Sequence, residues 1–401
     1  MSKKTLYKLF YADPSAVHAE YDKRFQDEDT IHLDIKIGEH SAFVCQSAEI
    51  FRLIISIERT NNKISQICNR LPGIALSQFQ QRCLIDEIVL TNNIEGVHST
   101  RKEISEILQD LSKNNKRERF VGLVNKYVLL MKSENLPLQT PEDVRKIYDD
   151  IFYEEIKATD PDDLPDGKIF RKNDVGVYSP TDKKIHDGLY PESKIISVMK
   201  KSLDFLNDNH CDILLRVAVF HYLFGYIHPF YDGNGRTSRF ISSYILSQNL
   251  NKLIGYRISF TIKEHINKYY KAFEICNHYN NRGDLTPFAE MFLGIVDISM
   301  HQLYQALSER SEKLMHYIDL ITQLPNAENE SMCRIYDYLI QAALFSNMGI
   351  SQKELECEMR MTYNTVRSRL KRIPEELLIT NKQGNRSFYL LNLKAVDESL
   401  K

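Results

Sequence analysis

No stretch of the 401 residues has the length and apolar character of a membrane-spanning helix. A span needs about 18 or more consecutive apolar residues, and charged residues interrupt each apolar run here before that length is reached. The first residues, MSKKTLYKLF, contain lysines but no long apolar segment, so they do not resemble a secretory signal peptide. These absences predict a cytoplasmic protein that does not associate with a membrane.

The sequence also lacks the cysteine pattern of a disulfide framework or of a zinc site. It has seven cysteines, an odd number, and no two of them form a C-x-x-C pair. Cysteines scattered in this way favour a reducing compartment. There is no internal repeat and no low-complexity tract, so repeat architectures are not expected.

Neither sign of charge dominates the sequence. The net charge is −2, which excludes a general electrostatic attraction to nucleic acid or membrane, so any basic surface must be local. Hydrophobic residues make up 43% and charged residues 26% of the chain, as is usual for a soluble globular protein. At roughly 100–200 residues per domain, this length predicts two to three domains.

Most of the sequence repeats apolar residues at helical spacing, which predicts a mainly α fold. Stretches such as EIFRLIISIERTNNKI and FQQRCLIDEIVLT place apolar residues three and four positions apart. The segment CDILLRVAVFHYLFGYI, residues 211–227, is apolar nearly all round and predicts a buried central helix. Residues 160–191 interrupt this pattern, because they are rich in Pro, Gly and Asp and contain a candidate hairpin arm, FRKNDVGVYS.

A dense polar motif, HPFYDGNGRTSR (residues 228–239), follows the buried segment directly. Its Gly-Asn-Gly turn leads into a new helix near Arg236, and backbone N–H groups at such a junction bind anions. Arg236 and Arg239 lie three positions apart, so both guanidinium groups can serve one pocket. Asp232 is suited to hold Mg²⁺ beside phosphate oxygens, and His228 is suited to accept a proton. The combination predicts a phosphoryl or nucleotidyl transfer site.

This motif resembles the signature of the Fic family, H-P-F-x-[D/E]-G-N-G-R-x-x-R, at every fixed position, and the resemblance covers roughly residues 85–315. It implies a protein adenylyltransferase, which transfers AMP from ATP to a Ser, Thr or Tyr hydroxyl of a target protein and releases pyrophosphate. By this resemblance His228 is the general base, Asp232 is the Mg²⁺ ligand and Phe230 anchors the loop in the core. The residues that would contact the nucleotide in the motif are Gly233, Asn234, Gly235, Arg236, Thr237 and Arg239.

Two further stretches resemble parts of the family. A flap at about residues 170–190 is the hairpin that clamps a target peptide by strand addition and covers the nucleotide, although an ordinary solvent-exposed hairpin is the alternative. The flap residues implied to lie over the nucleotide are Val175, Gly176, Val177 and Tyr178. The segment YYKAFEICN resembles the lining of the adenosine site and supplies Tyr269 and Asn277, with core packing as the other reading of Tyr269.

The stretch TNNIEG, residues 91–96, fits the inhibitory pattern of the family, [S/T]-x-x-x-E-[G/N]. The resemblance implies a helix at about residues 82–98 whose Glu95 pairs with Arg239 and occupies the place of the γ-phosphate, with Thr91 and Gly96 completing the pattern. A solvated helix end with Gly96 as its C-cap is the simpler alternative. In some relatives the same glutamate positions water that removes AMP, so a de-AMPylating or bifunctional enzyme stays open.

Composition shifts near the C-terminus, where residues 331–401 contain 11 Lys/Arg and 8 Asp/Glu and so carry a charge of about +3. Three candidate helices followed by a β-ribbon predict a winged helix-turn-helix. Basic side chains on its recognition helix and wing would contact the phosphates of duplex DNA, and protein docking or dimerisation is the alternative. These basic residues are Arg367, Arg369, Lys371, Arg372, Lys382 and Arg386.

The predicted organisation has three parts. They are an N-terminal helical region (1–84), a Fic domain (85–323) and a winged-helix domain (331–401), with a polar break at 324–330. The leading hypothesis is an autoinhibited protein adenylyltransferase that uses ATP and Mg²⁺, acts on a target protein and on itself, and forms a homodimer. One rival is a DNA-binding regulator whose Fic-like core senses a nucleotide, although the intact His228 argues against it. Another is an enzyme that transfers phosphate, phosphocholine or a different nucleotide.

Overall fold

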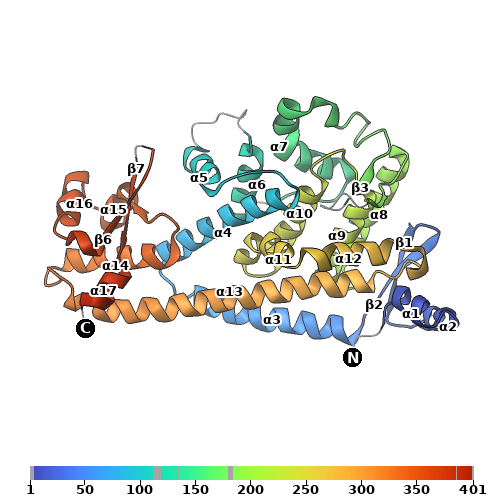
Figure 1. Ribbon diagram of the computed structural model, residues 1–401, viewed down its shortest axis with the longest axis horizontal. Coiled ribbons are helices and arrows are strands. Elements are labelled where there is room, and N and C mark those ends of the chain that lie inside the picture. Colours follow the sequence, from blue (N-terminus) through green and yellow to red (C-terminus); the bar gives the residue numbers. More distant parts are fainter. Residues whose placement is uncertain (1–3, 112–118, 133–134, 179–183, 385, 400–401) are drawn as a thin grey trace. The chain divides into compact units, whose positions relative to one another are not determined.

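The computed structural model describes residues 4–111, 119–132, 135–178, 184–384 and 386–399. The chain forms two compact units, one made of residues 1–61 and 85–301 and the other of residues 62–84 and 302–401. Both units are mainly helical, as the sequence predicts (Figure 1). Their boundaries fall inside three long helices, α3 (Ala48–Cys68), α4 (Gly73–Ile94) and α13 (Thr286–Leu320).

The other elements of the first unit are mostly helices, with two small hairpins. The helices are α1 (Leu6–Ala12), α2 (Ala16–Phe25), α5 (Arg101–Asp110), α6 (Val121–Lys132), α7 (Pro141–Thr159), α8 (Glu192–Asn207), α9 (Ile213–Ile227), α10 (Asn234–Asn249), α11 (Ile258–Glu264) and α12 (Ile266–Asn277). The antiparallel strands are β1 (Thr30–Ile37) with β2 (His40–Cys45), and β3 (Gly176–Tyr178) with β4 (Lys184–Asp187). Short 3₁₀ turns lie at Pro161–Asp163, Lys252–Tyr256 and Tyr279–Asn281.

Helix α9 is the buried centre of the first unit, as its apolar sequence predicts. It is buried along nearly its whole length and packs against α8 and α10 (Figure 1). Each fully buried large apolar side chain of this kind contributes about 1.5–3 kcal/mol. The helix ends at Ile227 because His228 adopts a left-handed conformation, with φ of 51°. Gly233, at φ of 77°, then starts α10, so the two helices hold both ends of the loop that contains the polar motif.

Helix α7 supports this loop from a different part of the sequence. Thr140 caps the start of this helix in a capping box with Asp143, and Pro141 occupies the first turn. The ring of Tyr148 on α7 stacks on Phe230 of the motif, with ring centroids 3.7 Å apart. The buried Phe230 is therefore an anchor of the loop, as its place in the motif predicts.

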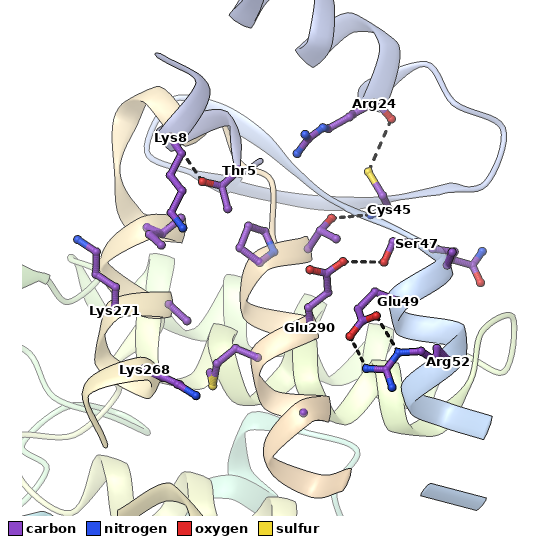
Figure 2. Close-up of a pocket in the computed structure, with 18 of the residues that line it drawn as sticks. Thr5, Lys8, Arg24, Cys45, Ser47, Glu49, Arg52, Lys268, Lys271 and Glu290 are labelled. Atoms are coloured by element: carbon purple, nitrogen blue, oxygen red, sulfur yellow. Dashed lines mark hydrogen bonds and ion pairs between the residues drawn. The ribbon is translucent and has the colours of Figure 1, made fainter. Parts of the chain in front are cut away.

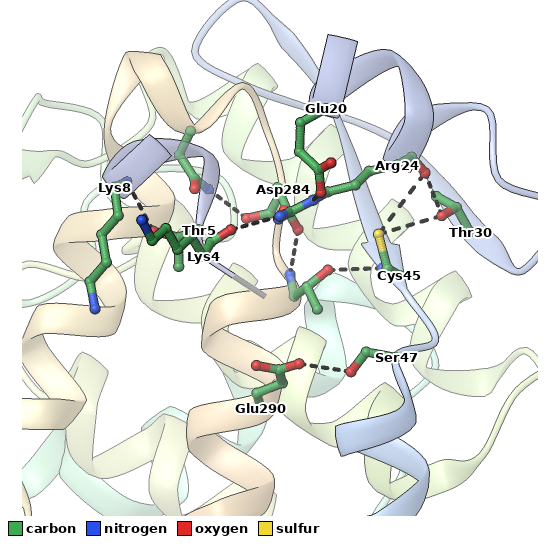
Figure 3. Close-up of polar contacts among 12 residues, drawn as sticks. Lys4, Thr5, Lys8, Glu20, Arg24, Thr30, Cys45, Ser47, Asp284 and Glu290 are labelled. Atoms are coloured by element: carbon green, nitrogen blue, oxygen red, sulfur yellow. Dashed lines mark hydrogen bonds and ion pairs between the residues drawn. The ribbon is translucent and has the colours of Figure 1, made fainter. Parts of the chain in front are cut away.

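The N-terminal region contains a hairpin that the prediction of a helical region missed. Alternate residues of β1 are buried, which is the period of a strand with one face against the core. Phe43 of β2 exchanges backbone hydrogen bonds with Gly283 and Leu285, just before α13. The buried Arg24 of α2 adds an ion pair to Asp284, 3.0 Å away (Figure 3). These contacts explain why residues 1–61 belong to the first unit.

The second unit contains the elements predicted for its C-terminal part. In order they are α14 (Glu330–Phe345), β5 (Ile350–Ser351), α15 (Gln352–Met359), α16 (Tyr363–Leu370), β6 (Leu378–Gln383), β7 (Arg386–Leu391) and α17 (Leu393–Ser399), with 3₁₀ turns at Ile321–Gln323 and Glu375–Leu377. The three strands form one sheet in the order β5-β7-β6. Ser351 caps α15 in a capping box with Glu354. Asn385 of the predicted wing turn lies outside the described residues.

None of the helices in the described part of the chain combines the length and the hydropathy that a membrane crossing requires.

Candidate functional site

His228 lies at the C-terminus of α9, where its left-handed backbone turns the chain out of the helix. Its imidazole is half-buried. Burial lowers the pKa of His228 to about 3, the positive charges of His186 and Arg171 act in the same direction, and a hydrogen bond to the backbone of Gly225 opposes them. The ring is therefore neutral near pH 7, which is the state that a group needs to accept a proton.

Asn234 closes the loop after His228. Its side-chain oxygen accepts a hydrogen bond from the Phe230 N–H at 2.9 Å, and its amide donates to the Phe230 carbonyl at 2.8 Å. Thr237 in the next turn donates its hydroxyl to the carbonyl of Gly233 at 2.8 Å. The side chains of Asn234 and Thr237 are thus engaged within the loop, and the backbone N–H groups at the start of α10 are the ones available to an anion.

Arg236 is buried between two carboxylates. Its guanidinium contacts Glu155 of α7 at 2.8 Å and Asp232 at 3.0 Å, and it lies 4.4 Å above the ring of Phe152. Only Oδ2 of Asp232 makes this ion pair, and the side chain of Asp232 is 48% exposed. A half-exposed carboxylate beside a phosphate site fits Mg²⁺, which binds one or two carboxylates together with phosphate oxygens. No cluster of three or more His, Cys, Asp or Glu side chains suited to a metal occurs among the described residues.

Arg239 is the meeting point of the motif and α4. Its Nη2 lies 2.7 Å from Glu95 Oε1 and also donates to the Thr91 carbonyl, and its Nε donates to the Thr91 hydroxyl at 2.8 Å. The ion pair that the two sequence patterns predict is therefore present. The Glu95 carboxylate lies so close to Gly235 that any side chain at position 235 would collide with it. Gly96 follows α4 at φ of 74°, a conformation that favours glycine.

The predicted flap is a two-stranded hairpin. Gly176 pairs with Asp187 and Val177 pairs with His186, and the register shifts before Tyr178. Residues 179–183, between the strands, lie outside the described part of the chain. Val175, just before β3, accepts a backbone hydrogen bond from Gly188.

The two predicted adenosine contacts occupy different environments on α12. Asn277 lies between the flap and α9, since its amide is 3.2 Å from His186 Nδ1 and its oxygen accepts from the Tyr222 hydroxyl at 2.6 Å. Tyr269 is buried, with its hydroxyl 2.7 Å from Nε2 of His221. The adjacent Tyr270 is less buried. Burial and the nearby Glu95 raise the pKa of Tyr270 to about 12.

Comparison with known proteins places this geometry in a family. A profile of the Fic/DOC family matches residues 138–246, which include the whole polar motif. These residues are therefore similar to a Fic domain. The solved structure of a part of Fic-1 from C. elegans superposes on 76% of this chain and 82% of that one with a TM-score of 0.50, at 19% identity, so the fold is shared.

Curated relatives of the Fic domain are named protein adenylyltransferase Fic. The protein from Aedes aegypti is 33% identical over 106 residues, which cover 26% of this chain and 19% of that protein. The protein from Drosophila virilis is 24% identical over 314 residues, which cover 76% of this chain and 58% of that protein. This chain thus matches less than two thirds of the length of these relatives.

Several residues that shape the Fic domain were not found from the sequence. Glu155 pairs with Arg236, and Arg171 donates to the carbonyls of His228 and Leu189 at 2.9 Å each. Arg171 also donates to the Asn173 carbonyl. His221 and His186 complete the set. Glu155 and His221 lie in no motif, and Arg171 and His186 lie in the predicted flap but outside the flap residues that the resemblance assigned to the nucleotide. For His221 the only signal was a histidine within an otherwise apolar helix.

A separate cavity of about 1110 Å³ lies elsewhere in the first unit. Lys8 and Lys268 lie on one side of it and Glu49 and Arg52 on the other (Figure 2). Within the described residues, its lining includes no member of the motif 228–239. The large cavity is therefore distinct from the candidate site formed around the motif 228–239.

Proposed function

We propose that the protein is an autoinhibited adenylyltransferase that transfers AMP from ATP to a hydroxyl side chain of a target protein. The observation that carries the proposal is the ion pair between Glu95 and Arg239, because it joins the inhibitory pattern to the last residue of a complete Fic motif. The names of the curated relatives support the chemistry. The scattered cysteines favour the cytoplasm as the place of the reaction.

The reaction needs a base, an anion site and neutralisation of a leaving group. His228, neutral near pH 7, accepts the proton of the substrate hydroxyl as its oxygen attacks the α-phosphorus. The bond from the α-phosphorus to the bridging oxygen breaks, and pyrophosphate leaves. Backbone N–H groups of the turn formed by Gly233, Asn234 and Gly235, together with Arg236 and Arg239, hold the phosphates. Asp232 would hold Mg²⁺, which would supply positive charge to offset the charge that develops on the leaving pyrophosphate.

Glu95 acts as the brake in this proposal. Its carboxylate lies against Gly235 and holds Arg239, so it occupies the space and the positive charge that the γ-phosphate of ATP requires. Thr91 adds two hydrogen bonds to the same guanidinium. ATP would then bind with its phosphates misplaced, and the resting enzyme would be nearly silent.

The test is the purified Glu95→Gly protein incubated with ATP and Mg²⁺, with covalent AMP on the protein itself measured by mass spectrometry. Loss of the brake should raise AMP incorporation at least about tenfold, which corresponds to roughly 1.4 kcal/mol of lost inhibition. Adding His228→Ala to the same variant should abolish the gain, because the base is removed. An unchanged level of AMP in Glu95→Gly would overturn the autoinhibition.

Glu95 also supports a second reading, in which it positions water for removal of AMP. Its side chain is 28% exposed, so one face of the carboxylate is accessible to solvent. Incubation of an AMP-modified target with the wild-type protein and with Glu95→Gly separates the two readings. Loss of AMP with the wild type alone identifies a de-AMPylating or bifunctional enzyme.

The flap is proposed as the surface that receives the target. A hairpin of two strands has free edges to which an extended peptide can add, and His186 links this hairpin to Asn277. A peptide bound there would present a Ser, Thr or Tyr hydroxyl towards His228. We also propose that the protein modifies itself and forms a homodimer.

A second candidate function, DNA binding, is favoured by the surface of the C-terminal elements. On α16 and in the turn after it, Arg367, Lys371 and Arg372 are exposed, and Lys382 and Arg386 are exposed beside the wing turn. A recognition helix and a wing with cations of this kind contact DNA phosphates in winged helix-turn-helix proteins. If duplex DNA does not bind, protein docking becomes the role of this surface.

A further inference from the structure

One face of α7 lies against the loop of the motif. Tyr148, Phe152 and Glu155 are spaced by four and three residues, so they share a face of this helix. The ring of Tyr148 stacks on Phe230, and a Cβ atom at Gly233 would lie 3.2 Å from the rings of both Tyr148 and Phe152. Glu155 is the charged member of this set of three. Helix α7 therefore holds the loop by packing at two positions and by one carboxylate at a third.

The carboxylate of Glu155 is buried against Arg236. Glu155 Oε1 lies 2.8 Å from Arg236 Nη1, and the side chains of Glu155 and Arg236 are 7% and 1% exposed. A buried carboxylate is costly unless an opposite charge pairs with it, and Arg236 supplies that charge. Arg236 also lies 4.4 Å above the ring of Phe152, on the same face of α7. The guanidinium of Arg236 is therefore fixed to α7 by an ion pair and by an aromatic ring.

Arg236 shares its charge between two carboxylates. Its Nη2 lies 3.0 Å from Oδ2 of Asp232, the proposed Mg²⁺ ligand, whose side chain is half-exposed whereas that of Glu155 is buried. One guanidinium and two carboxylates leave an excess of negative charge, which attracts a divalent cation. Without Glu155 the same guanidinium would neutralise Asp232 alone, and the attraction would weaken. Glu155 therefore leaves the charge of Asp232 available to a cation at its exposed side.

We infer that Glu155 is a positioning residue, which fixes Arg236 and offsets its charge so that Asp232 can hold the divalent cation that accompanies the nucleotide. The inference rests on the proposed adenylyl transfer and adds to it a residue that lies outside the motif. Glu155 acts through Arg236, with which its buried carboxylate pairs. A neutral side chain at position 155 should therefore weaken the binding of ATP with Mg²⁺. It should not weaken the binding of ATP alone, because the site would then repel the nucleotide less.

The test is the Kd of ATP, measured by calorimetry with Mg²⁺ and with EDTA. The full-length proteins carry Glu95→Gly to release the proposed brake and His228→Ala to prevent turnover. The ratio of the two Kd values is the gain in affinity that Mg²⁺ provides. We expect Glu155→Gln, which keeps the size of the side chain but removes its charge, to reduce this gain about five- to tenfold and to leave the Kd in EDTA unchanged or lower. With Asp232→Asn also present, Glu155→Gln should change the gain less than about twofold, because the two residues act together.

Asp150→Asn is the matched control, because Asp150 is also an ion-paired carboxylate of α7 but contacts Lys126 of α6, at 2.7 Å. It should leave the gain unchanged. An undiminished gain in Glu155→Gln would overturn the inference, and so would an equal reduction with and without the Asp232 carboxylate. Weaker binding by the same factor with Mg²⁺ and with EDTA would show a merely structural role.

A second variant tests the same charge balance without leaving a buried charge short of its partner. Glu155→Gln together with Arg236→Gln removes both charges of the buried ion pair, so no guanidinium neutralises Asp232. This protein should show a larger gain than Glu155→Gln alone, and an equal or smaller gain would contradict the inference.

Failure of the proposed function gives a different result. AMP incorporation by the Glu95→Gly protein with intact His228 would then be absent, while the Kd ratios would still report on Glu155. No binding of ATP with Mg²⁺ to the protein that carries Glu95→Gly and His228→Ala would overturn both.

Discussion

Single residues in and around the motif 228–239 divide between those proposed to contact an anion and those that hold the loop in shape. Arg171 is fully buried, and its guanidinium donates hydrogen bonds to backbone carbonyls on either side of the flap and after α9. Asn234 does the same for Phe230 with its amide. A place in the motif therefore does not by itself identify a residue as a nucleotide contact, because some motif side chains serve to hold the loop in its conformation.

Asn234→Ala tests this division. The substitution leaves the N–H and carbonyl of Phe230 without the partners that close the loop, and an unsatisfied buried polar group costs about 1–3 kcal/mol. We expect a loss of that size in the free energy of unfolding by urea. Asn249→Ala is the matched control, because the exposed Asn249 on the same helix makes a single hydrogen bond to Ile245. A cost for Asn234→Ala no greater than that of the control would contradict the structural role.

Pairs of residues were predictable from the sequence only where both members lie in recognisable patterns. Glu95 and Arg239 each belong to one, so their contact followed from the resemblance. Glu155 belongs to no pattern, and nothing in the local sequence shows that α7 brings it to Arg236. His221 is hidden for another reason, since an isolated histidine in an apolar helix is also compatible with simple packing.

At the scale of elements, α4 is fixed to the Fic domain at two places. Its C-terminal end is held through Thr91, Glu95 and Arg239. Two turns earlier, both oxygens of the buried Glu87 accept the Ser259 N–H near the start of α11, at 3.0 and 3.1 Å. The proposed brake therefore lies on a helix that is held at two places, and we expect its release to involve the contacts of Arg239 rather than detachment of the whole of α4.

Glu87 makes the free energy of unfolding depend on pH through its contact with Ser259. Burial raises the pKa of Glu87 from 4.5 to about 7, against hydrogen bonds from Ser259 and the charges of Arg239 and Arg257. Between pH 4.5 and pH 7 the folded protein keeps the Glu87 proton, whereas the unfolded chain has lost it. The contribution of protonated Glu87 to the free energy of unfolding is therefore complete below pH 4.5 and is lost as the pH rises towards 7. Glu87→Gln stays neutral and removes this loss. The Tm of the wild type should therefore drop more than that of Glu87→Gln between about pH 5 and pH 7.5, and parallel drops would refute the assignment.

The hairpin of β1 and β2 shows the limit of predicting elements from their neighbours. The sequence of β1, TIHLDIKI, alternates apolar and polar residues with the period of a strand, but the segments that follow it have helical periodicity. Its partner, the segment before α13, lies about 240 residues further along the chain, and local periodicity cannot show such a pairing. The central helix α9 was predictable because its sequence is a nearly continuous apolar run.

At the scale of the whole molecule, the proposed chemistry and the proposed DNA surface lie in different units. The residues of the Fic site, from Thr91 on α4 to Asn277 on α12, belong to the first unit, and the basic residues of α16 and the wing belong to the second. Each function can therefore be removed separately. Charge removal on α16 should leave AMP incorporation by the Glu95→Gly protein unchanged.

DNA binding is tested on the full-length protein by measuring its affinity for duplex DNA at several salt concentrations. Each phosphate contact releases a counterion, so loss of one should lower the slope of log K against log salt by about 1. Arg367→Ala and Arg372→Ala remove exposed cations at α16 and should each reduce both affinity and slope. Lys394→Ala, which removes an exposed cation on α17, should change neither. If the wild-type affinity does not depend on salt, or if all three variants behave alike, the exposed basic residues of α16 do not contact DNA and this surface docks a protein instead.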